Sequence, residues 1–165
     1  MVPVKTPEQM TQLLDSGQVD AGVLSPSAER RNRYLFSRAF VLEPLSYVVG
    51  EQHRNAAPEA LLKSGTVAMV RGFIPELVVG EAYGRLTTRQ FDKIEDALRC
   101  VATEVCDVTV LPLRVAKYYI NSKFPGSLFI TGELFDSIPV GAAFAVAPDH
   151  QILRDILDKV IAIIP

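Results

Sequence analysis

The apolar positions along this 165-residue chain change period several times, which predicts alternating helices and strands. In the first helix, Thr6 is the N-cap, Pro7 fits the first helical position and Gly17 ends the helix. Short apolar runs bounded by turn residues predict the strands. The pattern predicts helices over residues 6–17, 58–62, 76–83, 93–105, 112–120 and 150–164, and strands over residues 19–24, 45–50, 65–70, 84–87, 106–111, 128–130 and 140–146.

Two of these helices carry a regular apolar face. Asp92 is the expected cap of the helix over residues 93–105, with Glu95 three residues later. The last helix, residues 150–164, repeats large apolar residues on one face, which we expect to pack onto a sheet. Those residues are Ile152, Leu153, Ile156, Leu157, Val160, Ile161 and Ile164.

Composition limits the function classes. A hydrophobic content of 48% with 22% charged residues indicates a globular chain, and the length suits one domain or two small lobes. The net charge of -2 argues against a nucleic-acid surface. There is no apolar run long enough to span a membrane, and residues 1–5 do not have the pattern of a signal peptide.

The two cysteines, Cys100 and Cys106, leave two alternatives open. If both lie in one helix, their Cα atoms are about 9 Å apart, too far for a disulfide. If the helix ends between them, a bridge can form. We favour two small buried thiols. Neither His53 nor His150 lies near them in sequence, so we expect no metal site and no cofactor.

The segment after the first strand has the features of an anion-binding loop. The strand over residues 19–24 leads into Ser25-Pro26-Ser27, and Arg30 follows on a short helix that Ser27 can cap. A guanidinium at the carboxyl end of a strand suits the recognition of a small anionic group. From composition alone, Arg30 would instead be a solvated charge.

This segment carries a family resemblance. Asp20-Ala21, Ser25-Pro26-Ser27, Arg30 and Phe36-Ser37, in this order, resemble the first-lobe signature of the type 3 periplasmic solute-binding proteins, which have the Venus-flytrap fold. Asp96-Ala97-Leu98 followed by Asp107-Val108 resembles the second-lobe signature. The resemblance implies an α/β fold of the periplasmic-binding-protein type II class. It also implies that Arg30, with Ser25 and Ser27 beside it, holds a ligand carboxylate.

The resemblance covers nearly all of the chain and implies its domain organisation. The family begins with a βαβ unit that has no counterpart here, so we expect a fragment whose first lobe is truncated at its N-terminus, with the export signal upstream. Lobe 1 is expected from residues 1–51 and 138–165, and lobe 2 from residues 52–137. Gly50 and Gly141 are the expected hinge residues. A half-built sheet would leave apolar surface exposed, so we expect the chain to dimerise or to exchange elements.

The second lobe departs from the amino-acid receptors of the family. Gly72 follows the strand over residues 65–70, at a place where a helix N-terminus can bind an anion. The receptors have small hydroxyl residues next, whereas this chain has Phe73, which either lines an apolar pocket or packs in the core. Pro112 occupies the position of the acid that pairs with the ligand ammonium. The resemblance therefore implies a ligand other than an ordinary α-amino acid, such as a carboxylate without an amine.

Two functions follow from the resemblance. The chain resembles most the periplasmic sensor flytraps of BvgS/EvgS-type hybrid histidine kinases, because its end, residues 157–165, matches theirs and the ammonium-binding acid is absent. The alternative is a solute-binding receptor of an ABC importer. An enzyme is not expected, because Glu133 and Asp136 are explained by a turn and no other pair suggests acid–base catalysis.

Overall fold

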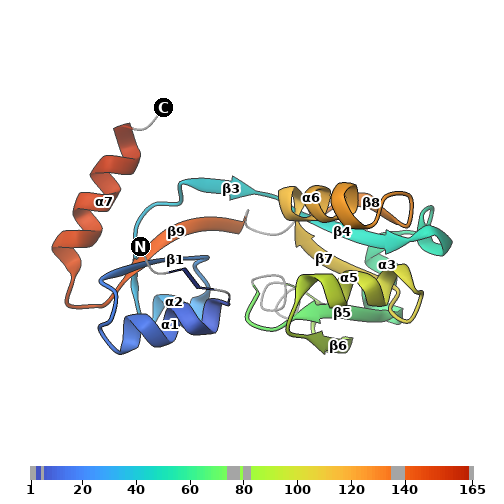
Figure 1. Ribbon diagram of the computed structural model, residues 1–165, viewed down its shortest axis with the longest axis horizontal. Helices are drawn as coiled ribbons and strands as arrows, with labels where there is room; N and C mark the ends of the chain where they lie inside the picture. Colours follow the sequence, from blue (N-terminus) through green and yellow to red (C-terminus); the bar gives the residue numbers. More distant parts are fainter. Residues whose placement is uncertain (1–2, 5, 74–78, 80–82, 135–139, 164–165) are drawn as a thin grey trace. The chain divides into compact units, whose positions relative to one another are not determined.

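The computed structural model describes residues 3–4, 6–73, 79, 83–134 and 140–163. The chain divides into two compact units (Figure 1): unit 1 comprises Met1–Leu42 and Val140–Pro165, and unit 2 comprises Glu43–Pro139. The two chain crossings therefore lie at residues 42–43 and 139–140. The first crossing lies earlier in the chain than the predicted boundary after residue 51, because the strand over residues 45–50 pairs entirely within unit 2.

Unit 1 is a four-stranded sheet with helices at its sides. The sheet order is β1-β9-β2, with β3 also paired to β9, so that β9 is central. Both β1 and β2 run antiparallel to β9, with Ala21 opposite Val146 and Leu24 opposite Ala143. The elements are α1 (Pro7–Asp15), β1 (Ala21–Leu24), α2 (Ala28–Arg31), β2 (Leu35–Phe36), β3 (Val41–Glu43), β9 (Val140–Val146) and α7 (Gln151–Ile163).

Unit 2 is a five-stranded mixed sheet in the order β6-β5-β7-β4-β8. Strand β5 runs parallel to β6 and β7, whereas β4 runs antiparallel to β7 and β8. Its elements are β4 (Leu45–Gly50), the 3-10 helix η1 (Glu51–His53), α3 (Pro58–Ser64), β5 (Thr66–Val70), β6 (Thr87–Phe91), α5 (Ile94–Ala102), β7 (Val108–Pro112), α6 (Leu113–Lys123) and β8 (Leu128–Glu133).

The local sequence signals explain most of these elements. The hydroxyl of Thr6 accepts a hydrogen bond from the Gln9 N–H, and Pro7 begins α1, as predicted. Gly17 follows α1 with a φ of 66°, in the left-handed region that glycine adopts freely. Strands β4 and β7 are buried at every position, which agrees with their mainly apolar sequences; each contains one buried hydroxyl residue, Ser46 and Thr109.

Several predicted elements differ from the observed ones. Strand β6 spans Thr87–Phe91 instead of residues 84–87, because it pairs in parallel with the whole of β5. Helix α5 begins after Lys93 without a side-chain cap, so the cap expected from Asp92 is wrong. The helix predicted over residues 76–83 lies almost entirely outside the described residues.

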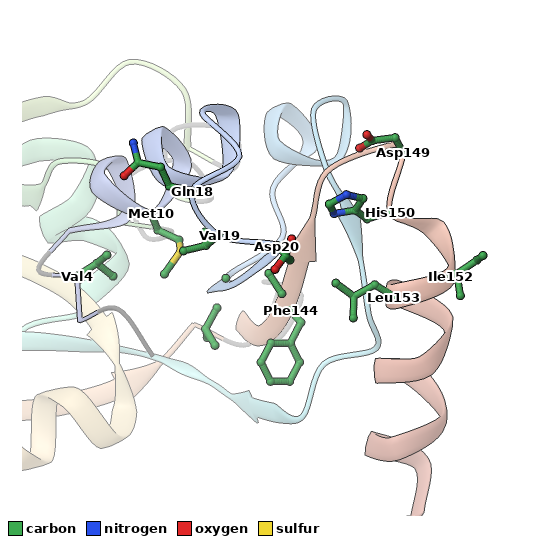
Figure 2. A pocket seen from close by; sticks show the side chains of 13 residues that line it. Val4, Met10, Gln18, Val19, Asp20, Phe144, Asp149, His150, Ile152 and Leu153 are labelled. Carbon is green, nitrogen blue, oxygen red and sulfur yellow. The ribbon is translucent and has the colours of Figure 1, made fainter.

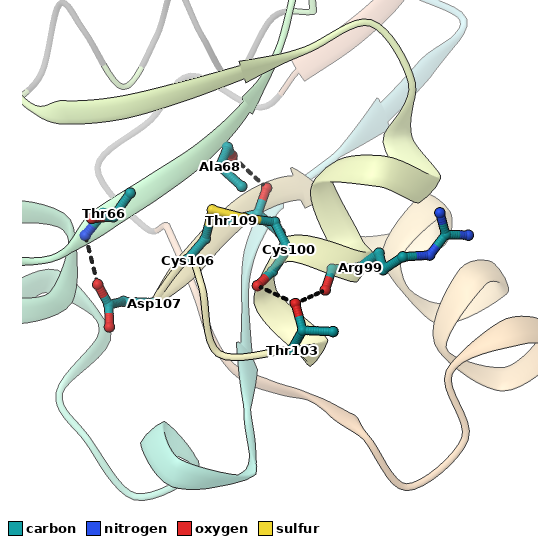
Figure 3. Close-up of a disulfide and its surroundings, with 8 residues drawn as sticks. All are labelled: Thr66, Ala68, Arg99, Cys100, Thr103, Cys106, Asp107 and Thr109. Carbon is teal, nitrogen blue, oxygen red and sulfur yellow. Dashed lines mark hydrogen bonds between the residues drawn. A yellow bond between two sulfur atoms is a disulfide. The ribbon is translucent and has the colours of Figure 1, made fainter.

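Helix α5 also ends earlier than predicted, and this decides the state of the two cysteines. Glu104 has a φ of 60°, which reverses the chain after the helix. The Cα atoms of Cys100 and Cys106 consequently lie 5.2 Å apart, and the two residues form a disulfide (Figure 3). The favoured interpretation of two buried thiols was wrong, because the helix ends between the cysteines.

The two units have cores of different size. In unit 2 the buried cluster contains residues of the sheet and of helices α5 and α6: Val48, Ala68, Val70, Ala97, Leu98, Cys100, Val101, Cys106, Leu111, Ala116 and Leu128. Among the described residues of unit 1, a buried cluster contains Leu14, Leu24, Tyr34 and Ala145. Helix α7 contributes no fully buried residue to it.

The prediction that one apolar face of the last helix packs onto a sheet holds for half of that face. Leu153, Leu157 and Ile161 are partly buried, and α7 contacts β9 and β2. The remaining apolar residues form a second stripe that is exposed in unit 1. We call it the α7 stripe: Ile152, Ile156, Val160 and Ile163, with exposed fractions of 78%, 52%, 46% and 81%.

Candidate functional site

The loop that follows β1 brings together three of the predicted ligand-binding residues. The hydroxyl of Ser27 accepts a hydrogen bond from the backbone N–H of Arg30 at 3.2 Å and so caps α2, as predicted. The Arg30 guanidinium turns back and donates from Nη1 to the carbonyl oxygen of Ser25 at 3.1 Å. Ser25, Ser27 and Arg30 therefore form one closed loop. Their contact with a ligand stays a prediction.

Arg30 is not the solvated charge that composition alone would suggest. Only 9% of the residue is exposed. Burial lowers the pKa of its guanidinium below the ordinary value, while the carboxylates of Glu8 and Glu29 act in the opposite direction. A buried guanidinium with a fixed direction is better prepared for binding an anion than a flexible surface arginine is.

Contacts between α1 and the residues after α2 hold this loop in place. Asp15, at the end of α1, accepts a hydrogen bond from the Tyr34 hydroxyl and forms an ion pair with Arg33, each at 2.6 Å. Two causes raise the pKa of Tyr34 to about 12: burial is the larger, and the hydrogen bond to Asp15 is the second. The Arg33 ion pair was not predicted, because its partner is 18 residues away and no local pattern connects the two residues.

The predicted site in unit 2 lies at the turn after β5. Gly72 has a φ of 67°, which a residue with a side chain rarely adopts. Phe73 packs against the buried cluster of unit 2, which favours the core over a pocket wall as its place. The helix expected to start after this turn lies outside the described residues, so an anion site at its N-terminus stays a prediction.

The N-terminus of α6 is already capped within the chain. Pro112, which has no N–H, precedes the helix. The Leu113 N–H donates to the carbonyl oxygen of Pro44 at 3.0 Å, and the Arg114 N–H donates to the carboxylate of Glu43 at 2.9 Å. A carboxylate therefore does lie beside the Pro112 position, but the helix N-terminus holds it.

The two expected hinge glycines have different surroundings. Gly50 ends β4 inside unit 2, where an added Cβ would come within 3.0 Å of the Val101 carbonyl oxygen, so it does not lie at a chain crossing. Gly141 is the second residue after the return crossing. A Cβ there would lie 2.7 Å from the Cβ of Ala39, so close packing of β9 against the segment before β3 requires glycine. The hinge roles stay predictions.

Unit 1 contains an open hollow of about 1050 Å³ beside β1 (Figure 2). Its wall is mostly apolar, with Met10 from α1, Phe144 from β9 and Leu153 from α7. Asp20, Asp149 and His150 add polar groups. Ser25, Ser27 and Arg30 do not line it. The hollow is therefore separate from the predicted ligand loop, and Ile152 makes it continuous with the α7 stripe.

A polar cluster in unit 2 brings together His53, Asp107 and the backbone N–H of Thr66. The Asp107 carboxylate accepts a hydrogen bond from the Thr66 N–H at 2.6 Å and interacts with Nε2 of His53 at 2.9 Å (Figure 3 shows the Thr66 contact). The Thr66 hydrogen bond lowers the pKa of Asp107, burial opposes it, and His53 adds to the lowering. The cluster joins η1 to the starts of β5 and β7, next to the disulfide.

The described residues contain neither a metal-binding cluster nor a helix that could cross a membrane. Across them, no group of three or more histidine, cysteine, aspartate or glutamate side chains is arranged to hold a metal ion. The helices in this described part of the chain are too short or too polar to cross a membrane.

Comparisons with known proteins give one consistent answer. The virulence sensor protein BvgS of Bordetella bronchiseptica is 31% identical over 160 residues, which are 96% of this chain and 13% of that protein. The periplasmic VFT2 domain of Bordetella pertussis BvgS superposes with a TM-score of 0.86 at 29% identity, covering 98% of this chain and 69% of that one. The chain has the Venus-flytrap fold. The flytrap fold predicted from the sequence is confirmed.

Transport receptors share this fold. An amino acid ABC transporter substrate-binding protein from Streptococcus pneumoniae, bound to L-arginine, superposes with a TM-score of 0.81 at 19% identity, which shows the fold alone. It covers 97% of this chain and 68% of that protein. A scan against family models found no match. This flytrap chain spans about an eighth of the length of the curated sensors that it matches.

Proposed function

We propose that this flytrap chain is the periplasmic ligand-sensing domain of a membrane-bound sensor histidine kinase. The observation that carries the proposal is the superposition on the BvgS VFT2 domain over nearly the whole chain, at 29% sequence identity, whereas the L-arginine-bound transport receptor is 19% identical. In this role the domain binds a ligand and has no catalytic task. The two-component signalling step belongs to other parts of the parent protein.

The parent protein distinguishes this proposal from a solute receptor. An antibody to residues 1–165 is applied to fractionated source cells. A membrane-bound band several times larger than this domain, which becomes labelled when the membranes receive γ-³²P ATP, is the expected result. A small band in the soluble periplasmic fraction would overturn the sensor assignment and would support the second candidate, a receptor of an ABC importer, which the fold of the L-arginine-bound transport protein favours.

The proposed ligand is a small carboxylate held by Arg30. The buried guanidinium presents planar N–H donors that match a carboxylate, and its contact with Ser25 fixes its direction. The Pro112 position has no acid that is open to an ammonium group, because Glu43 caps α6. A carboxylate without an amine therefore suits these residues better than an α-amino acid does.

Arg30→Ala tests the ligand proposal. A panel of aliphatic and aromatic monocarboxylates and dicarboxylates is screened by thermal shift, and binders are measured by calorimetry. Removing the partner of a buried carboxylate costs about 2–5 kcal/mol, so affinity should fall about 30-fold or more. Arg31→Ala is the matched control, because Arg31 is exposed on the same helix. Equal affinity of Arg30→Ala and the wild type would exclude Arg30 as the carboxylate ligand.

A homodimer is a further part of the proposal. The α7 stripe exposes four large apolar side chains in succession, and such patches commonly mark interaction sites. Sedimentation of the purified chain measures the association.

A further inference from the structure

Residues 36–40 form a segment that is attached along β9. The Ser37 N–H donates to the Phe144 carbonyl oxygen at 2.9 Å, and the Phe144 N–H donates to the Ser37 hydroxyl at 3.0 Å. Further along, the Phe40 N–H donates to the Ala142 carbonyl oxygen at 2.9 Å. The rings of Phe40 and Phe144 are also in contact, with centroids 5.0 Å apart. We call residues 36–40 the crossing segment.

The crossing segment adjoins both places where the chain passes between units. It leads directly into β3, whose last residue, Glu43, is the first residue of unit 2. The strand to which it is bonded, β9, begins at Val140, the first residue after unit 2. At Gly141 the two segments are packed so closely that an added Cβ would meet Ala39. Both crossings are therefore connected to this segment through the backbone.

One side chain joins the crossing segment to α7. The carboxylate of Asp158, in the middle of α7, accepts a hydrogen bond from the backbone N–H of Arg38 at 2.5 Å. A carboxylate that accepts from a backbone N–H forms a charge-assisted bond, which is stronger than a neutral one. On the same helix, Leu157 is partly buried, whereas Asp155 pairs with its neighbour Arg154. Asp158 is thus on the inner side of the helix, and Asp155 is on the outer side.

We propose that Asp158 is the positioning residue that couples the crossing segment to α7. A change of backbone at the crossings moves the Arg38 N–H, and the carboxylate of Asp158 passes this change to the last helix of the domain. The proposal rests on the sensor function proposed above, because that function requires a path from the ligand-binding part of the domain to its end. A ligand can use this path only if it binds the two arrangements with different affinity.

Four variants test the coupling. Asp158→Ala removes the acceptor, and Arg38→Pro removes the N–H donor of the same hydrogen bond. Asp155→Ala changes a carboxylate on the outer side of the same helix, and Arg38→Ala removes the side chain but keeps the N–H donor. Hydrogen exchange on residues 1–165 is measured at Arg38 and along α7. Autophosphorylation without added ligand is measured with γ-³²P ATP on membranes that contain the whole parent protein.

The proposal expects both broken-bond variants to behave alike. In Asp158→Ala, hydrogen exchange at the residue-38 amide should rise several-fold, and in both variants exchange along α7 should rise by a similar factor. Basal autophosphorylation should shift about fivefold or more in either direction, which is in the range of allosteric couplings. Asp155→Ala and Arg38→Ala should match the wild type in both measurements. Arg38→Pro keeps the test valid if Asp158→Ala does not fold.

Three outcomes would overturn the coupling. Unchanged exchange along α7 in both variants would mean that the bond does not position the helix. Raised exchange with unchanged autophosphorylation would mean that Asp158 is merely structural, while the sensor function would stand. An equal effect of Asp155→Ala would show a general response of α7. Absence of autophosphorylation in the wild type would instead contradict the sensor function. In that case, comparing hydrogen exchange in Asp158→Ala and Asp155→Ala would still decide whether Asp158 connects the crossing segment to α7.

Discussion

In unit 2, strands β4 and β7 are buried at every position, and the disulfide lies against the same core. In unit 1, by contrast, β1 alternates between buried and less buried residues, and α7 has no fully buried residue. The two units are built from similar elements but differ in how completely these elements cover one another. Unit 2 therefore has its core within residues 43–139. Unit 1 leaves the α7 stripe and an open hollow uncovered within this chain.

This difference indicates where stability and where adaptability lie. A unit with a large buried cluster unfolds cooperatively and resists local opening, whereas a unit with few buried apolar contacts opens more easily. The predicted ligand loop and the crossing segment both belong to unit 1. The less completely packed unit thus contains the parts that are proposed to respond to a ligand, and the four predictions below test this contrast.

The largest effect is expected from the core of unit 2. Leu98 is fully buried on α5, so Leu98→Ala leaves a cavity and should lower the free energy of unfolding by about 2–5 kcal/mol. Urea unfolding followed by circular dichroism measures this loss. Val105→Ala is the control, since Val105 is 55% exposed and its change should stay within about 0.5 kcal/mol. A loss below 1 kcal/mol for Leu98→Ala would contradict a tightly packed unit 2.

The disulfide should contribute the next largest share. Replacing both Cys100 and Cys106 by serine opens a short loop, for which chain entropy gives a loss of roughly 2 kcal/mol. The unfolding midpoint of the wild type should therefore fall on addition of a reductant that reduces the bond in the unfolded chain. The double variant should be insensitive to the same reductant. Equal midpoints for the wild type and the double variant would remove the disulfide from the account of unit 2.

The cluster around Asp107 should make the stability of unit 2 depend on acid pH. Because the folded pKa of Asp107 lies below its ordinary value of 3.8, its stabilisation is complete above that value and is lost as the pH falls through the folded pKa. Asp107→Ala also leaves the Thr66 N–H without this acceptor, at a cost of about 1–2 kcal/mol near neutral pH. Unfolding free energies measured from pH 7 to pH 2 test both effects.

Two controls accompany the pH series. Asp92→Ala removes an exposed carboxylate whose partner, Arg71, is also exposed, and it should leave the acid dependence unchanged. His53→Ala keeps the Thr66 hydrogen bond and should weaken the acid dependence only in part. If Asp107→Ala and the wild type lose stability in parallel between pH 4 and pH 2, Asp107 does not cause the acid dependence.

The elements that sequence reasoning predicted well carry their signals locally. The capped start of α1, the apolar strands β4 and β7, and the Ser27 cap of α2 each depend on residues within a few positions of one another. The flytrap fold was available from the resemblance, because motif order survives where single residues change. The same resemblance pointed to Arg30, but not to its burial.

Apart from the disulfide, which depends on a local reversal of the chain, the features that were missed depend on residues that are distant in sequence. The disulfide required the left-handed Glu104, which no local preference announces. His53 meets Asp107 across 54 positions, and Asp158 meets Arg38 across 120. The apolar face of α7 was predicted, but a periodic stripe does not tell how much of its width a sheet will cover. These contacts follow from tertiary packing alone.

The smallest effect on stability is expected at the α7 stripe, where Ile156 is 52% exposed. Ile156→Lys should change the free energy of unfolding by no more than about 0.5 kcal/mol, because the side chain loses little buried area. It should nevertheless abolish association of the purified chain in sedimentation experiments, since a charge interrupts the exposed apolar patch. Leu157→Lys is the matched control: the neighbouring residue is partly buried, so the same charge should destabilise unit 1.

If Ile156→Lys associates as the wild type does, the α7 stripe is not the contact surface. If Ile156→Lys destabilises the chain as much as Leu157→Lys, residue 156 is covered within the chain, and unit 1 is more completely packed than the contrast with unit 2 requires.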